Sequence, residues 1–181
     1  MKRLAQLFII IGALLYFVGM YQVWLRVNPN RLAFSEYPTV EKATVKSDTV
    51  STPIRLLINN KLIDIPVIPA EVSNNIWQTT ENGASYLTSS PIPGQKGNSV
   101  IYAHNWSGLF ANLPQVKPGD TVEILYADNT RKVFEIKYTS YVSPNEATIL
   151  APSKDQRITL YTCAGWFDSK RFVAVAILKD A

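Results

Sequence analysis

The stretch from Leu4 to Leu25, LAQLFIIIGALLYFVGMYQVWL, contains no charged side chain. A helix of this length, rising 1.5 Å per residue, matches a bilayer hydrocarbon core of about 30 Å. A cleaved signal peptide is the alternative, but its apolar core is usually shorter. The RVNPN that follows also offers no small-residue cleavage site. We therefore predict a transmembrane helix over residues 4–25, so that the rest of the chain must fold on its own beside the membrane.

The residues that flank this run predict its orientation. Lys2 and Arg3 precede it, and Tyr21 and Trp24 lie near its far end, where interfacial aromatic residues are common. The positive-inside rule then places residues 1–3 in the cytoplasm and everything after the span outside the cell. We expect a single-pass protein of the cell membrane with an extracytoplasmic domain.

Net charge argues against a nucleic-acid partner. The formal net charge is +4, from 18 basic and 14 acidic residues. Lys2 and Arg3 account for two of the basic residues, which leaves 16 against 14 in the remainder. That balance is too even for a surface that binds a polyanion.

Residues 26–52 are polar with few large apolar side chains, and we interpret them as an extracytoplasmic stalk. Residues 53–181 form the expected domain, in which turn residues separate short runs rich in Ile, Val, Tyr and Thr. Helix is expected only near 107–113 and 145–150, and ADNT at 127–130 predicts a hairpin. Closing the strands into a barrel would remove exposed edges, so we predict a mainly β, barrel-like domain. The runs are IRLLI, LIDIPVIP, NSVIYAH, DTVEILYA, RKVFEIKYTSYV, RITLYTC and RFVAVAIL.

Cys163 is the only cysteine and His104 the only histidine of the chain. In RITLYTC, strand alternation puts Cys163 on the face opposite Ile158 and Leu160, at the end of the run. A short connection leads to RFVAVAIL, so Arg171 should return close to Cys163. His104 likewise ends its run. Three reactive side chains thus fall at strand ends, where functional sites commonly lie.

These residue types suit nucleophilic catalysis. A free thiol has a pKa of about 8.5, and a neighbouring cation favours the reactive thiolate. A histidine can protonate a leaving amine, and a guanidinium can stabilise an oxyanion. Taken singly, each residue has a simpler explanation: a lone cysteine is often buried filler, and a lone histidine or arginine is often only solvated or packed.

The pattern around these residues resembles the sortases, the membrane-anchored cysteine transpeptidases of bacterial cell surfaces. TLYTC at 159–163 is similar to the family's T-L-x-T-C strand end, and KRFVAVAIL is similar to the strand that begins with its essential arginine. GNSVIYAHNWSGLFANLPQVKPGDTVEI resembles the segment that carries the family's histidine, and PIRLLINNKLIDIPVIP resembles its opening strands. The resemblance covers about residues 53–179.

The resemblance implies a closed eight-stranded sortase-type β-barrel with short helices and a peptide groove on its outside. It implies a thioester at Cys163, acid/base catalysis by His104, and substrate positioning or oxyanion stabilisation by Arg171, with Thr162 lining the oxyanion pocket. Trp106, Phe110, Trp166 and Phe167 are candidates to wall the groove, although packing of the loops explains them nearly as well.

The implied substrates are surface proteins with a C-terminal sorting motif of the Leu-Pro-x-Thr-Gly kind. The acyl group would pass to an amine from a cell-wall precursor or another protein. The sequence contains no Asp-Pro-aromatic lid motif before the barrel and no apolar tail, so we expect a class other than the pilin-polymerising one. The sorting motif, the acceptor and the class itself stay open.

Other functions remain as alternatives. The cysteine L,D-transpeptidases place His and Gly directly before their cysteine, and Tyr161 and Thr162 stand there instead. A thiol peptidase that only hydrolyses, or an anchored barrel that only binds a partner, would fit the same span and strands. We expect no metal or other cofactor, since one His and one Cys do not make a ligand set. Scattered acidic residues leave open a bound Ca²⁺ of the kind found in some relatives. Asp168 and Glu146, both in predicted loops, are the candidates to orient the histidine.

Overall fold

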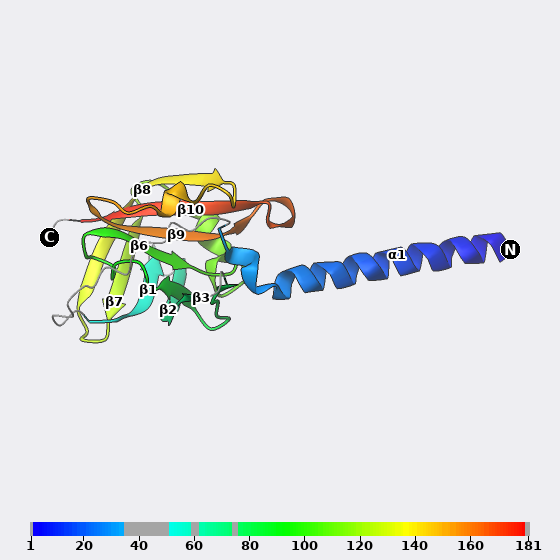
Figure 1. Ribbon diagram of the computed structural model, residues 1–181, viewed down its shortest axis with the longest axis horizontal. Coiled ribbons are helices and arrows are strands. Elements are labelled where there is room, and N and C mark those ends of the chain that lie inside the picture. The colour runs from blue at the N-terminus through cyan, green and yellow to red at the C-terminus, as the bar shows by residue number, and fades with distance from the viewer. Residues whose placement is uncertain (1, 35–50, 59–61, 74–75, 180–181) are drawn as a thin grey trace.

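The computed structural model of the protein describes residues 2–34, 51–58, 62–73 and 76–179. The first element is α1 (Lys2–Val27), a single helix that extends away from the domain (Figure 1). Its Lys2–Trp24 portion is long and apolar enough to cross a membrane, and it buries nothing against the rest of the chain. This agrees with the predicted N-terminal apolar span and supports a membrane anchor.

Eight strands close into a barrel in the order β1-β2-β5-β6-β9-β10-β8-β7, and β7 pairs back with β1. The pairs β2–β5 and β6–β9 are parallel, and the others are antiparallel. The barrel strands are β1 (Pro53–Ile58), β2 (Ile63–Ala70), β5 (Ala84–Leu87), β6 (Gly97–Tyr102), β7 (Thr121–Tyr126), β8 (Arg131–Val142), β9 (Gln156–Ala164) and β10 (Lys170–Leu178). The prediction of a mainly β, closed eight-stranded barrel is confirmed.

Short elements connect the barrel strands. A two-stranded ribbon, β3 (Val72–Ser73) with β4 (Ile76–Trp77), lies beside the barrel. The other helices of the described residues are short 3-10 helices: η1 (Pro29–Leu32), η3 (Phe110–Gln115), η4 (Ala147–Leu150) and η5 (Trp166–Asp168). η3 and η4 fall within a few residues of the two short helices expected from the sequence. The expected ADNT hairpin joins β7 and β8, with Asn129 at a positive φ of 65°.

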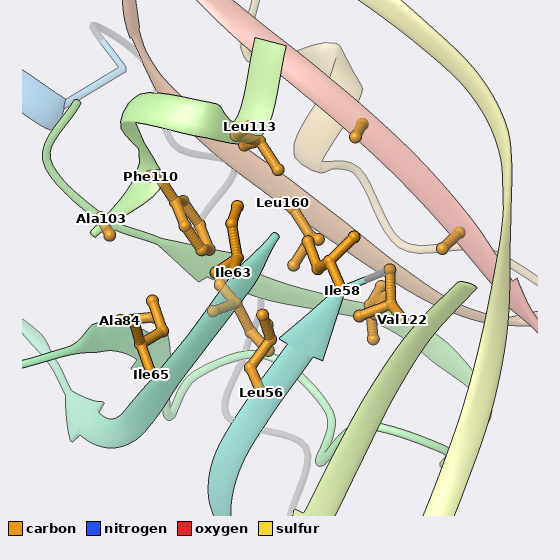
Figure 2. Close-up of a cluster of buried hydrophobic side chains, with 14 of the residues drawn as sticks. Leu56, Ile58, Ile63, Ile65, Ala84, Ala103, Phe110, Leu113, Val122 and Leu160 are labelled. Carbon is orange, nitrogen blue, oxygen red and sulfur yellow. The ribbon is translucent and has the colours of Figure 1, made fainter. Parts of the chain in front are cut away.

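The barrel interior is filled by alternate aliphatic residues of its strands (Figure 2). Along β9, Ile158 and Leu160 point into this core, as the alternation predicts. The labelled members are Leu56, Ile58, Ile63, Ile65, Ala84, Ala103, Phe110, Leu113, Val122 and Leu160. The barrel interior is therefore filled by apolar side chains, and Cys163 lies on the outer face of the barrel.

A second buried cluster lies on the other face of β6, β9 and β10. Tyr102, Tyr161, Cys163 and Val173 belong to it, together with Trp77 of the ribbon. Because β9 is buried on both faces, every residue from Ile158 to Ala164 is buried. Cys163 thus sits on the outside of the barrel wall but beneath further chain.

Candidate active site

The three predicted catalytic residues come together in one row across neighbouring strands. β6 and β9 are parallel with Tyr102 opposite Tyr161, so His104 and Cys163, each two positions further on, reach the same edge of the sheet. β10 returns antiparallel and pairs Arg171 directly with Cys163. The cysteine therefore stands on the central strand, with the histidine and the arginine at either side.

Thr162 faces away from Cys163 and is occupied by the backbone. Its hydroxyl donates a 2.8 Å hydrogen bond to the carbonyl of Ala103. That bond ties the end of β9 to the residue before His104 and helps to set the spacing of the row. In this arrangement Thr162 positions the strand ends and does not point its hydroxyl at the thiol.

His104 is held by its loop. Its imidazole stacks on Trp106 at 4.2 Å between ring centroids with 10° between the planes, and its carbonyl accepts a 3.0 Å hydrogen bond from the Phe110 amide. Burial lowers the pKa of His104 below its ordinary value, and the nearby Arg31 cation lowers it further, against the opposing charges of Glu81 and Asp168. The imidazole is therefore neutral at physiological pH and able to accept a proton.

A segment that follows α1 covers this row, and we call residues 29–34 the strap. The Cys163 thiol donates to the carbonyl of Arg31, with 3.1 Å from Sγ to oxygen. Arg171 donates from Nη2 to the carbonyl of Ala33 at 3.0 Å, and the Tyr161 hydroxyl donates to the carbonyl of Leu32 at 3.1 Å. Three successive carbonyls of the strap thus accept hydrogen bonds from the outer face of β9 and β10.

The strap also buries its apolar side chains in the outer cluster. Leu32 is fully buried and Phe34 is 1% exposed. The Phe34 ring packs edge-on against Tyr161, with centroids 5.0 Å apart, and lies 6.5 Å from Trp77. The beginning of the predicted 26–52 stalk thus lies against the barrel. Two buried apolar side chains and three backbone carbonyls hold it there, and the part of the stalk at 35–50 lies outside the described residues.

The strap leaves the thiol in a protonated, inaccessible state. Cys163 is 2% exposed. Burial raises the pKa of the Cys163 thiol to about 11, with Asp168 adding to the rise, against the lowering effects of Arg171 and Arg31. In this closed arrangement, an outside molecule could reach the sulfur only if the strap moved.

Arg171 is anchored by the chain around it. Its Nη1 donates to the carbonyls of Asp168 and Lys170 at 2.9 and 3.1 Å, while its Nη2 reaches the strap. The Nη1 side of the guanidinium is thus fixed to the β9–β10 hairpin that carries Arg171. Displacing Ala33 would free the other side, beside Cys163, for a substrate carbonyl.

Asp168 belongs to the site, and Glu146 does not. The Asp168 carboxylate forms an ion pair with Arg31, whose guanidinium also donates to the side-chain oxygen of Asn105 at 3.2 Å. Asp168 acts electrostatically on His104 and Cys163, but among the described residues the imidazole donates no hydrogen bond to its carboxylate. Glu146 is exposed in the turn before η4. The residue that would orient His104 stays unassigned.

The aromatic residues divide into three groups. Trp106 lies against the histidine, whereas Phe110 is buried in the barrel core, so the packing explanation holds for Phe110. Trp166 is 82% exposed and contacts Phe167 edge-on at 5.3 Å in the connection between β9 and β10. Trp106 therefore lies at the site beside His104, whereas the exposed Trp166 ring has no contact with the row among the contacts of the described residues. That Trp106 and Trp166 bind a substrate stays a prediction.

The described residues include no group of three or more His, Cys, Asp or Glu side chains able to hold a metal. The expectation that the protein needs no cofactor stays a prediction.

The strap was not predicted from the sequence. The signal was NRLAF at 30–34, where two large apolar residues interrupt an otherwise polar stretch. Its contacts use carbonyl groups, which any residue supplies, so no side-chain motif identified it.

Comparison with known proteins identifies relatives of this domain. A family model of the sortase domain matches residues 56–179. Sortase A of Listeria monocytogenes is 33% identical over 101 residues, which cover 54% of this chain and 45% of that protein. The chain thus spans under half the length of this curated relative.

Solved structures give the same fold. Sortase A from Corynebacterium diphtheriae superposes with a TM-score of 0.62 at 26% identity, covering 74% of this chain and 64% of that one. Sortase C from Clostridium perfringens, determined with the C-terminal cell wall sorting motif, has a TM-score of 0.58 at 19% identity and covers 74% of this chain and 75% of that one.

Proposed function

Because the chain belongs to the sortase family, we propose that it is a cysteine transpeptidase that cleaves a sorting-signal peptide through a thioester at Cys163. The observation that carries the proposal is the row of His104, Cys163 and Arg171 across three hydrogen-bonded strands. Sortases are cell-wall transpeptidases, and this row supplies a nucleophile, an acid/base and a cation side by side.

The first half of the reaction begins when the strap leaves. Exposure to water removes the main cause of the raised thiol pKa, and the Arg171 cation beside Cys163 then favours the thiolate. The thiolate attacks the scissile carbonyl, and the free side of Arg171 stabilises the oxyanion that develops. Neutral His104 takes up the proton that the thiol loses, and the resulting imidazolium gives it to the leaving amine. The acyl group stays on sulfur as a thioester.

The second half transfers the acyl group to an amine. An amine attacks the thioester, and the restored Cys163 thiol completes the cycle. The substrates would be surface proteins with a C-terminal sorting motif, and the acceptor an amine of a cell-wall precursor or of another protein. The family member from Clostridium perfringens was solved with such a motif. An anchor formed by α1, with its N-terminus in the cytoplasm, would place the barrel where both substrates occur.

One observation favours a different function. Cys163 is nearly inaccessible, as expected of an inert cysteine in an anchored barrel that only binds a partner. The two functions differ in whether the strap ever opens. An inert cysteine would remain unlabelled in the presence of any peptide, whereas the transpeptidase must expose its thiol to its substrate.

The test uses the full-length protein in detergent micelles with a library of sorting-signal peptides and mass spectrometry. We expect an acyl adduct on Cys163 and a transfer product that increases with added glycine peptide while the hydrolysis product falls. Cys163→Ala should abolish both, and His104→Ala should keep the fold but lose most turnover. A free-acid product at every amine concentration would instead identify a hydrolase, and the lack of any adduct would favour the binding module.

A further inference from the structure

A guanidinium occupies a place beside the proposed nucleophile. The Arg31 side chain pairs with the carboxylate of Asp168 and donates from Nη2 to the side-chain oxygen of Asn105. Arg31 and Asp168 are 137 positions apart in the chain, so this is a contact between the strap and the barrel. The backbone carbonyl of the same residue meets the thiol of Cys163.

The two groups that hold this cation belong to the barrel. Asn105 directly follows His104 in the loop after β6, and Asp168 lies in the connection between β9 and β10, three residues before Arg171. Both therefore flank the catalytic row and stay there when the strap leaves. Opening the strap removes their cation and leaves an anionic carboxylate and an amide oxygen beside the reacting sulfur.

A second, independent observation is a buried polar atom, in the residue that precedes Asn105, without a partner among the described residues. His104 is 5% exposed, and its Nδ1 has no hydrogen-bond partner within the described part of the chain. A buried ring nitrogen without a partner costs free energy, which a ligand that donates a hydrogen bond would recover. The Asp168 carboxylate can attract an ammonium group, and the neutral His104 imidazole can accept the proton that the ammonium must lose.

We propose that Asp168 and Asn105 form the subsite for the ammonium group of the acceptor amine, and that Arg31 occupies this subsite in the closed enzyme. The proposal rests on the proposed transpeptidase function. It identifies the acceptor as a cationic primary amine and assigns Asp168 a role in selecting it. In the closed enzyme, Arg31 then does two things: its side chain excludes the acceptor, and its backbone carbonyl covers the thiol.

The proton balance of the transfer step is complete with these groups. The bound ammonium gives one proton to neutral His104 and becomes a nucleophilic amine. Its nitrogen forms a bond to the thioester carbon, and the carbon–sulfur bond breaks to release the Cys163 thiolate. The second proton on nitrogen passes to that thiolate, which leaves an amide and a free thiol, and the imidazolium returns its proton to water.

A purely structural role for Asp168 is the competing explanation, because its ion pair with Arg31 also holds the strap closed. The test therefore uses full-length protein in the Arg31→Met background, where that ion pair is already absent. The Arg31→Met protein is compared with two double variants, which carry Asp168→Asn or Asn105→Ala in addition. Glu146→Gln, which removes an exposed carboxylate away from the row, is the matched control.

The readout is the amine concentration that gives half-maximal transfer, measured with two nucleophiles. The ε-amine of Nα-acetyl-lysine amide has a pKa of about 10.4 and is cationic at neutral pH, whereas hydroxylamine, a much weaker base, is uncharged. In the Arg31→Met background, Asp168→Asn should raise the half-saturating concentration of the lysine derivative about tenfold, as expected for the loss of one charge-assisted contact. Hydroxylamine carries no cation, so the same substitution should change its half-saturating concentration much less. The rate of thioester formation is measured separately, because Asp168 also acts electrostatically on the Cys163 thiol.

Two further results support the proposal. Arg31→Met alone should lower the half-saturating concentration of the lysine derivative, because it removes the competing cation, and Asn105→Ala should act in the same direction as Asp168→Asn but less strongly. Equal effects of Asp168→Asn on both nucleophiles, or an effect on neither, would overturn the subsite while leaving the transpeptidase intact. Failure to form any thioester would refute the proposed function itself, and the acceptor subsite with it.

Discussion

Phe34→Ala should open the site. Phe34 is 1% exposed and packs against Tyr161 and Trp77, so its ring stabilises the closed strap. Truncating a buried phenylalanine to alanine costs about 3–5 kcal/mol. The cost falls on the closed state alone, since the ring leaves its pocket when the strap opens. At about 1.4 kcal/mol per tenfold, the open population should rise at least about 100-fold.

Labelling of Cys163 by iodoacetamide measures this population. The full-length protein is treated in detergent micelles, and the adduct is followed by mass spectrometry. The labelling rate of Phe34→Ala should rise in proportion to the open population until most molecules are open. The melting temperature should fall less than for a core variant, because the loss is limited to the free energy with which the strap docks on the barrel.

Phe134→Ala is the matched control, since it removes an equally buried ring from the interior of β8. It should lower the melting temperature strongly and expose Cys163 only through unfolding of the barrel. If Phe34→Ala labels no faster than the wild type while its melting temperature is unchanged, the strap does not govern access to the thiol. A Phe34→Ala protein that melts as early as the control would mean that the strap is an integral part of the barrel's stability.

Three further predictions follow from the site and the anchor. The thiol pKa of about 11 in the closed form, against about 8.5 for an exposed cysteine, means that the closed form binds this proton more tightly. The closed state should therefore become less stable as the pH rises from about 8.5 to 11. In Phe34→Ala, the pH at which the alkylation rate is half-maximal should fall toward the ordinary thiol pKa. An unshifted pH midpoint would contradict this. Arg171→Lys should keep the fold but lose about 100-fold in kcat/KM for a fluorogenic sorting peptide, because an ammonium cannot hold the Asp168 and Lys170 carbonyls and the oxyanion together. Unchanged kcat/KM would remove Arg171 from the reaction. The full-length protein should fractionate with membranes, with residues 53–181 open to protease added outside intact cells; protection of the domain would reverse the orientation.

Much of the barrel could be read from the sequence because its strands obey simple periodic rules. In β9, alternation separated Ile158 and Leu160 from Cys163, and the two buried clusters lie on those two faces. The short connection to β10 correctly brought Arg171 opposite Cys163. β5, ASYL at 84–87, was missed because four small and mixed residues show no period, and its parallel pairing with β2 is a long-range contact.

The sequence by itself determined the membrane-spanning run, the strand pattern and the three reactive residues, because hydrophobic length, side-chain alternation and rare residue types are local properties. Only the tertiary structure decided that His104, Cys163 and Arg171 share one edge, since the parallel pairing of β6 with β9 joins segments that are distant in the chain. The tertiary structure also decided that the strap closes the site. The strap is held by backbone carbonyls and by apolar contact with strands that are distant in the chain. Neither kind of contact leaves a motif in the local sequence.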